Sequence, residues 1–140
     1  MRSALEVVVD TNVLFMGLEY PERKAGQILK AGFEGKIPLV SPSTVMTELY
    51  RLLQIKLGKP EWYLNYILDS LPVHWYPEEI YISFMEQAKI MPHKPDRPLV
   101  ALALLLNCGV LSANYRHFRH IKKFVKVWDI DELLKTIGEG

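Results

Sequence analysis

Cysteine is nearly absent from this sequence, which holds only Cys108 among its 140 residues. A single cysteine cannot form a disulfide within the chain, and it argues against a cysteine-based zinc site. Long hydrophobic runs are also missing, since the longest, Leu99–Leu106, is far below the roughly 20 residues that span a bilayer. The first apolar run, Val7–Val9, stops at Asp10, which argues against a signal peptide. We therefore expect a soluble, cytoplasmic protein with no membrane partner.

An excess of charge of one sign is missing too. The chain has 17 basic and 16 acidic residues and a formal net charge of +1. The net charge therefore argues neither for nor against binding of nucleic acid, and a basic surface that binds nucleic acid would have to be local. A length of 140 residues without repeats, linkers or low-complexity stretches fits one compact domain. We predict a single domain over residues 1–140.

Short apolar segments are predicted to alternate with helices. We predict strands over residues 7–9, 37–40, 73–75, 110–112 and 124–128. We predict helices over residues 22–33, 42–57, 61–68, 77–90, 99–106 and 131–137, with a proline-rich loop over 91–98. Ser41 can cap the second of these helices, and Pro42 suits its first position. Strands that alternate with helices indicate a three-layer α/β/α fold around a central parallel sheet.

Three acidic residues stand out by their position. Asp10 directly follows the first predicted strand, and ligands of open parallel sheets bind just beyond the carboxyl ends of the strands. Glu48 falls at the flank of the apolar stripe of its helix, and Asp96 precedes the buried helix over 99–106. Each also has a plainer interpretation: Asp10 as a cap or turn residue, Glu48 as a solvated helix residue, and Asp96 as an N-cap. A capping carboxylate still has oxygen atoms for a second role.

If these acids converge, they suit a hard divalent cation. Mg²⁺ and Mn²⁺ prefer carboxylate oxygen and water as ligands. Such an ion can clamp a phosphodiester, lower the pKa of an attacking water and stabilise the leaving oxygen. Carboxylates that share a site repel one another, and a cation relieves that repulsion. The sequence alone does not show that the three acids meet.

Four segments in order resemble the PIN domain family. They are the opening Val-Val-Val-Asp-Thr-Asn over 7–12, Ser41-Pro42 followed by Thr47-Glu48-Leu49, the Asp96-Arg97-Pro98 start of an Ala/Leu-rich helix, and Ser112-Ala113-Asn114-Tyr115-Arg116-His117-Phe118. Each segment alone is weak evidence for the family. The four segments together cover nearly the whole chain, and their order and spacing make the resemblance specific.

The resemblance implies Mg²⁺- or Mn²⁺-dependent hydrolysis of RNA phosphodiesters. It implies that Asp10, Glu48 and Asp96 hold the metal, and that Asn12 supports Asp10 by hydrogen bonding. Many small PIN proteins are toxins of the VapC kind that an antitoxin holds inactive. The resemblance thus predicts a metal-dependent ribonuclease with an RNA substrate and an antitoxin partner.

One departure from the family pattern opens an alternative. Tyr115 stands where the fourth segment usually carries an aspartate, and a tyrosine is a poor Mg²⁺ ligand because its phenol stays protonated near neutral pH. The alternative is a degenerate PIN domain that binds RNA or a protein partner without cutting. A third class, other phosphoryl-transfer enzymes with an aspartate after a strand, lacks support, since Asn12 breaks the Asp-x-Asp pattern and no P-loop is present.

A basic segment follows the fourth motif. Residues 114–126 contain no acid, and they interleave cations, which can contact phosphate, with aromatic rings, which can stack on bases. We predict nucleic-acid contacts from Asn114, Arg116, His117, Arg119 and Lys122, with a solvated surface as the alternative. His117 and His120 could share a helix face, but no cysteine nearby supports a soft-metal site.

Aromatic residues crowd the predicted helix over 61–68. Trp62, Tyr63 and Tyr66 could be core residues or an exposed patch for a partner. In PIN proteins this region often contributes to pairing, so the resemblance favours a homodimer.

Overall fold

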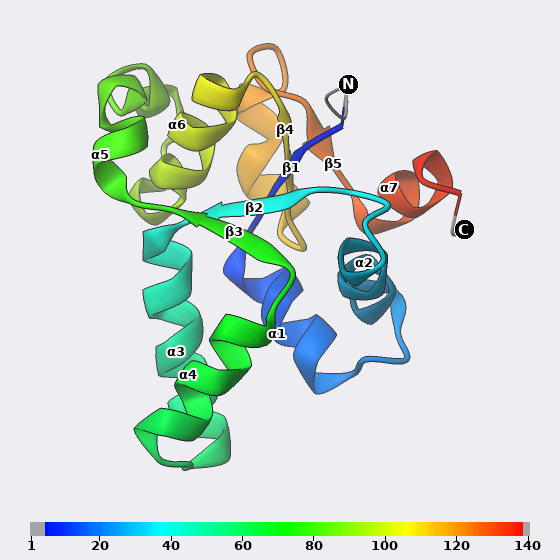
Figure 1. Ribbon diagram of the computed structural model, residues 1–140. Helices are drawn as coiled ribbons and strands as arrows, with labels where there is room; N and C mark the ends of the chain where they lie inside the picture. Colours follow the sequence, from blue (N-terminus) through cyan, green and yellow to red (C-terminus); the bar gives the residue numbers. More distant parts are fainter. Residues whose placement is uncertain (1–4, 139–140) are drawn as a thin grey trace.

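A five-stranded parallel sheet lies at the centre of the computed structural model, which describes residues 5–138 (Figure 1). The strand order is β3-β2-β1-β4-β5, and every neighbouring pair is parallel. The strands are β1 (Val7–Val9), β2 (Leu39–Pro42), β3 (Val73–Tyr76), β4 (Gly109–Leu111) and β5 (Val127–Trp128). This is the central parallel sheet that the alternation of strands and helices predicts.

Helices cover both faces of the sheet. The α-helices are α1 (Thr11–Glu19), α2 (Lys24–Phe33), α3 (Ser43–Leu57), α4 (Glu61–Ser70), α5 (Glu78–Tyr81), α6 (Arg97–Leu106) and α7 (Ile130–Thr136). Short 3-10 helices are η1 (Ile82–Phe84), η2 (Gln87–Ile90), η3 (Lys94–Asp96) and η4 (Tyr115–Ile121). Figure 1 shows α5 and α6 on one side of the sheet and α1 and α2 on the other, with the α3–α4 pair extending away from it.

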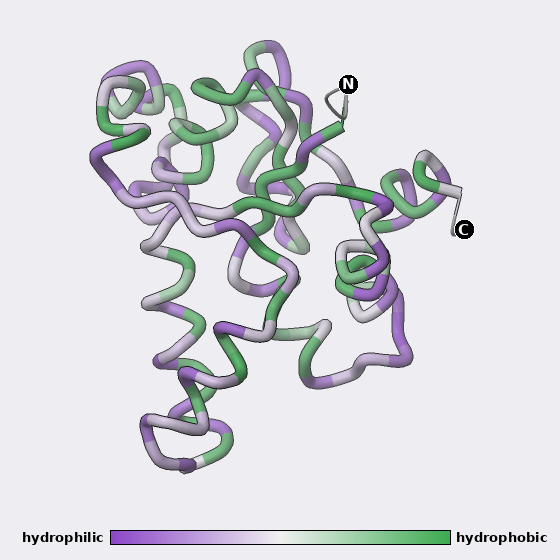
Figure 2. Tube along the Cα trace, in the orientation of Figure 1, coloured by the Kyte–Doolittle hydropathy of each residue, from purple (hydrophilic) through white to green (hydrophobic). Residues whose placement is uncertain are grey.

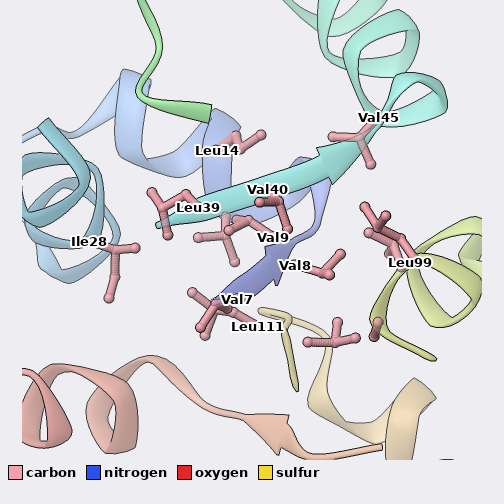
Figure 3. Close-up of a cluster of buried hydrophobic side chains, with 14 of the residues drawn as sticks. Val7, Val8, Val9, Leu14, Ile28, Leu39, Val40, Val45, Leu99 and Leu111 are labelled. Carbon is pink, nitrogen blue, oxygen red and sulfur yellow. The ribbon is translucent and has the colours of Figure 1, made fainter. Parts of the chain in front are cut away.

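The strand β1 is the centre of the hydrophobic core. All three of its valines are completely buried, because helices cover both faces of a parallel sheet and leave no side for polar residues. The hydrophobic colour follows β1 along its length in Figure 2. Figure 3 shows Ile28 of α2 and Leu99 of α6 on opposite sides of the strands. This packing fixes the position of the residue that follows β1.

Several predicted boundaries are wrong. No helix was predicted over α1, because its apolar residues do not form one stripe. The single helix predicted over 77–90 is instead α5 followed by η1 and η2. Ser41 does not cap α3. It is a buried residue of β2 whose hydroxyl donates to the Val9 carbonyl, and Pro42 takes the N-cap position. The proline-rich loop contains η3, and α6 begins two residues earlier than predicted.

The carboxyl ends of β1, β2 and β4 lie at one edge of the sheet because the strands are parallel and in register. The helix α6 precedes β4 and leads back to the start of that strand, so its N-terminus lies at the same edge. Within residues 5–138 no helix is long and apolar enough to cross a membrane.

Candidate metal-dependent active site

A small pocket of about 60 Å³ opens at the carboxyl edge of the sheet. Its lining comes from the end of β1 and the start of α1, from the first turns of α3, and from the η3–α6 junction. The lining residues are Asp10, Thr11, Asn12, Thr44, Val45, Glu48, Pro95, Asp96 and Leu99. The structure therefore brings together the four residues that the sequence analysis assigned to catalysis.

Asp10 is the most buried acid of this pocket, with only 6% of its surface exposed. It caps α1, because its Oδ1 accepts a hydrogen bond of 3.1 Å from the Val13 N–H. The other carboxylate oxygen accepts from the Ser112 hydroxyl. The capping role and the site role therefore coexist in one side chain.

Burial raises the pKa of Asp10 from its ordinary value of 3.8 to about 6. The hydrogen bonds from Ser112 and Val13 lower this pKa, and the carboxylates of Asp96 and Glu48 raise it. The burial and the two neighbouring acids outweigh the hydrogen bonds. A cation beside Asp10 would stabilise its charged form.

Ser112 reaches Asp10 because of the strand register. Val9 of β1 pairs with Leu111 of β4, so the next residue of each strand lies side by side at the sheet edge. The Ser112 oxygen also accepts a 2.9 Å hydrogen bond from the Asn114 N–H. Both interactions hold the hydroxyl in a fixed orientation toward Asp10.

Glu48 and Asn12 complete the pocket from two helices. Both residues are exposed to solvent, yet both line the cavity. Glu48 precedes the fully buried Leu49 in α3, so its position at the flank of the apolar stripe turns it toward the pocket. Among the described residues, the hydrogen bonds to the Asp10 carboxylate come from Ser112 and Val13, not from Asn12.

Asp96 occupies the N-cap position of α6 without using its side chain as a cap. Its Oδ2 instead lies 2.8 Å from Nδ1 of His93 and 3.6 Å from Nδ1 of His117. The Nε of the neighbouring Arg97 donates to the Met91 carbonyl at 2.8 Å. The capping interpretation of Asp96 is therefore wrong for its side chain.

The donors of this pocket fit a hard divalent cation. Three carboxylates line it, and none of its described lining residues is a lysine, arginine or histidine. Burial, and to a smaller extent the two outer acids, raise the pKa of Asp10, and no basic residue of the described lining balances its charge. Oxygen donors around unbalanced negative charge are the environment that Mg²⁺ and Mn²⁺ prefer.

The predicted nucleic-acid residues lie on η4 and its flanks. Asn114, Arg116, His117, Arg119 and Lys122 are all exposed, while Phe118 and Ile121 are buried and anchor the segment. Tyr115 does not line the pocket; the Lys122 Nζ lies 4.3 Å from the centre of its ring. The cationic surface thus begins at Ser112 and Asn114, next to Asp10.

The aromatic residues of α4 form an exposed patch. Trp62 and Tyr66 are 70% and 68% exposed, and Tyr63 is 36% exposed. Tyr63 also lines a groove of about 350 Å³ with Phe15 of α1 and Leu53 of α3. Of the two interpretations of these aromatics, the structure favours a surface patch over core residues.

Ser112 and His93 are site residues that the sequence analysis did not assign. A polar residue directly after the apolar strand β4 was a usable signal for Ser112, as Asp10 after β1 was. His93 lies 24 residues before His117 in the chain, and no spacing rule connects the two. In the sequence, His120 is the histidine nearest to His117 and could share a helix face with it.

The α/β fold places the clustered carboxylates at the carboxyl edge of its parallel sheet, where open sheets of this kind bind their ligands. The PIN domain model matches residues 8–134. The chain belongs to the PIN domain family, as the sequence motifs predict.

Two solved structures show the same fold. The DNA-bound VapBC from Salmonella typhimurium matches with a TM-score of 0.70 and 16% identity over 90% of this chain and 98% of that chain. VapBC2 from Rickettsia felis, bound to a DNA fragment from its promoter, matches with a TM-score of 0.61 and 16% identity over 89% and 98%. The comparison with curated proteins gave no significant match. These likenesses confirm the predicted three-layer fold.

Proposed function

We propose that this chain is a Mg²⁺- or Mn²⁺-dependent endoribonuclease, and that residues 1–140 act as one PIN domain. The observation that carries the proposal is the meeting of Asp10, Glu48 and Asp96 in one pocket without a basic residue among its described lining. Carboxylates that raise the pKa of a buried neighbour cost free energy unless a cation binds among them. Membership of the PIN domain family supports the same chemistry.

Asp10, Glu48 and Asp96 would hold the ion, which when bound activates a water and stabilises the charge that develops on the phosphate. Ser112 positions the Asp10 carboxylate by donating to it. The exposed cations Arg116, Arg119 and Lys122 would contact backbone phosphates, which orients an RNA strand across the pocket. Three acids instead of four suffice for one ion, since Mg²⁺ often uses one or two carboxylates together with water and phosphate.

The experiment is an RNA cleavage assay with untagged protein, labelled single-stranded and hairpin RNA, and Mg²⁺, Mn²⁺ or EDTA. We expect cleavage with either metal, none with EDTA, and none by Asp10→Asn. Asp69→Asn, an exposed carboxylate on α4, is the matched control and should cut like the wild type. If the wild type and Asp10→Asn are equally inert with both metals and both RNAs, the chain is a binding module, as Tyr115 would allow.

We further propose that the chain is the toxin of a toxin–antitoxin pair in the cytoplasm. The support is the fold shared with VapBC proteins and the apolar groove beside Tyr63, which suits a helix of an antitoxin or of a second copy of this chain. Induced expression should stop bacterial growth, and Asp10→Asn should restore it. Growth arrest by both forms, or by neither, would contradict the toxin assignment.

A further inference from the structure

A cluster of metal-binding side chains lies beside the acidic pocket. His93, Asp96 and His117 each offer one ligand atom, and the three atoms lie within 4.8 Å of one another. The Nδ1 atoms of His93 and His117 lie 2.8 and 3.6 Å from the same oxygen, Asp96 Oδ2. The Asn114 side-chain nitrogen also lies 2.9 Å from His117 Nδ1. Their ring centroids are 4.9 Å apart.

These distances suit one ion. Zinc binds histidine nitrogen at about 2.0–2.1 Å and carboxylate oxygen at about 2.0–2.2 Å, so two ligands of a tetrahedral ion lie about 3.4 Å apart. The two observed nitrogen–oxygen distances of 2.8 and 3.6 Å fall on either side of that value. Small rotations of the exposed histidine side chains would bring all three atoms to bonding distance.

A simple ion pair does not explain the arrangement. His93, at 2.8 Å from the Asp96 oxygen, already forms a hydrogen bond with it. His117 at 3.6 Å adds little to that pair, and it would exchange its contact with the Asn114 side chain for the ion. If both imidazoles were protonated, they would repel each other. A cation bound by both nitrogens and the carboxylate makes use of all three groups.

The site would also be open. The side chains of His93 and His117 are 51% and 43% exposed, and that of Asp96 is 18% exposed. Three protein ligands with solvent at the remaining position are the pattern of accessible zinc sites, whereas structural sites have four protein ligands.

We propose that His93, Asp96 and His117 form a binding site for a divalent transition-metal ion of the Zn²⁺ or Co²⁺ type. Imidazole nitrogen suits such ions, whereas Mg²⁺ prefers oxygen, so this site is distinct in selectivity from the pocket formed with Asp10 and Glu48. Asp96 belongs to both sites, and its Oδ2 is the oxygen nearest to the two histidines. The proposal does not depend on whether the chain cleaves RNA.

The test is a titration of untagged, metal-free protein with Co²⁺, followed by visible absorption, and with Zn²⁺, followed by calorimetry. Excess Mg²⁺ is present in both so that the oxygen site is occupied. We expect one equivalent to bind with a Co²⁺ spectrum of nitrogen and oxygen ligands. His93→Ala and His117→Ala should each weaken binding by at least about tenfold, since even the loss of a group behind a ligand costs that much.

The other two histidines of the chain provide matched controls. His74 and His120 are exposed and lie outside the cluster, so His74→Ala and His120→Ala should bind like the wild type. Asp10→Asn should also bind, which separates this site from the proposed nuclease site. Absence of Co²⁺ and Zn²⁺ binding by the wild type would overturn the proposal. Equal binding by folded His93→Ala and His117→Ala, checked by circular dichroism, would overturn it as well.

Discussion

The buried charge of Asp10 should make the metal-free protein less stable than a variant with a neutral side chain at this position. Its pKa lies at about 6 in the folded protein, against an ordinary value of 3.8. A tenfold change in proton affinity corresponds to about 1.4 kcal/mol. The ionised carboxylate therefore lowers the free energy of unfolding at pH 7 by about 3 kcal/mol.

The sign of the pH dependence follows from proton binding. The folded state holds the Asp10 proton more tightly than the unfolded state does, so this stabilisation is complete below about pH 4. It is lost as the pH rises through about 6. Asp10→Asn has no charge to titrate, and its amide oxygen can still accept from the Val13 N–H. In EDTA the variant should match the wild type near pH 4 and exceed its unfolding free energy by about 2–3 kcal/mol at pH 7.5.

Urea denaturation of both proteins between pH 4 and 8, with EDTA present, measures this difference. Titrating groups outside the pocket are common to the two proteins and cancel in the comparison. Asp69→Asn, which alters an exposed acid of α4, should show no comparable pH-dependent gain. Saturating Mg²⁺ should stabilise the wild type, by about 2.7 kcal/mol at one hundred times the dissociation constant, and should leave Asp10→Asn unchanged. A difference between Asp10→Asn and the wild type that is the same at every pH would refute the reasoning from burial.

Three further predictions concern the site, the packing of α2 and the binding of RNA. Ser112→Ala should lower the free energy of unfolding by about 1–3 kcal/mol. Because the hydrogen bond that it removes lowers the pKa of Asp10, the pH–rate profile of cleavage should also move to higher pH, and an unmoved profile would contradict this role. Gly26→Ala would place a Cβ 2.0 Å from the Pro21 carbonyl oxygen, so thermal denaturation should show a loss of at least about 4 °C in Tm, and an unchanged Tm would contradict this close approach. Arg119→Gln should reduce the salt dependence of RNA binding, measured by anisotropy, by about one ion in slope; an unchanged slope would place RNA elsewhere.

The layers of the fold could be predicted because a short β-branched run such as Val7–Val9 is typical of a strand that helices cover on both faces. The same pattern failed over α1, where apolar residues on several sides, with Thr11 and Asn12 in its first turn, hide the helical period. The predicted helix over 77–90 is also divided in the structure, and it contains three β-branched isoleucines of modest helix propensity, Ile80, Ile82 and Ile90.

The acids of the site could be predicted because strand ends and helix starts are visible in sequence. Asp10 follows a strand and Asp96 precedes a helix, whereas Glu48 was found by its place at the flank of the apolar stripe of α3. The parallel topology brings these positions to one edge. The contact between His93 and His117 could not be predicted, because it depends on how η3 and η4 fold back toward each other. Residue types show which groups can bind a metal, but loop geometry decides which of them meet.

The fourth segment contributes to the site through hydrogen bonds. Tyr115, at the position of the missing acid, has its ring beside Lys122, whereas Ser112 donates to Asp10 and His117 approaches Asp96. Asn114 joins these two, since its N–H donates to the Ser112 oxygen and its side-chain nitrogen lies 2.9 Å from His117 Nδ1. A chain of polar groups without a carboxylate thus connects the first and third acids, and it adds no fourth negative charge. With less charge to balance, the carboxylate pocket itself suits one hard cation, and a second ion would have to rely on the imidazoles beside Asp96.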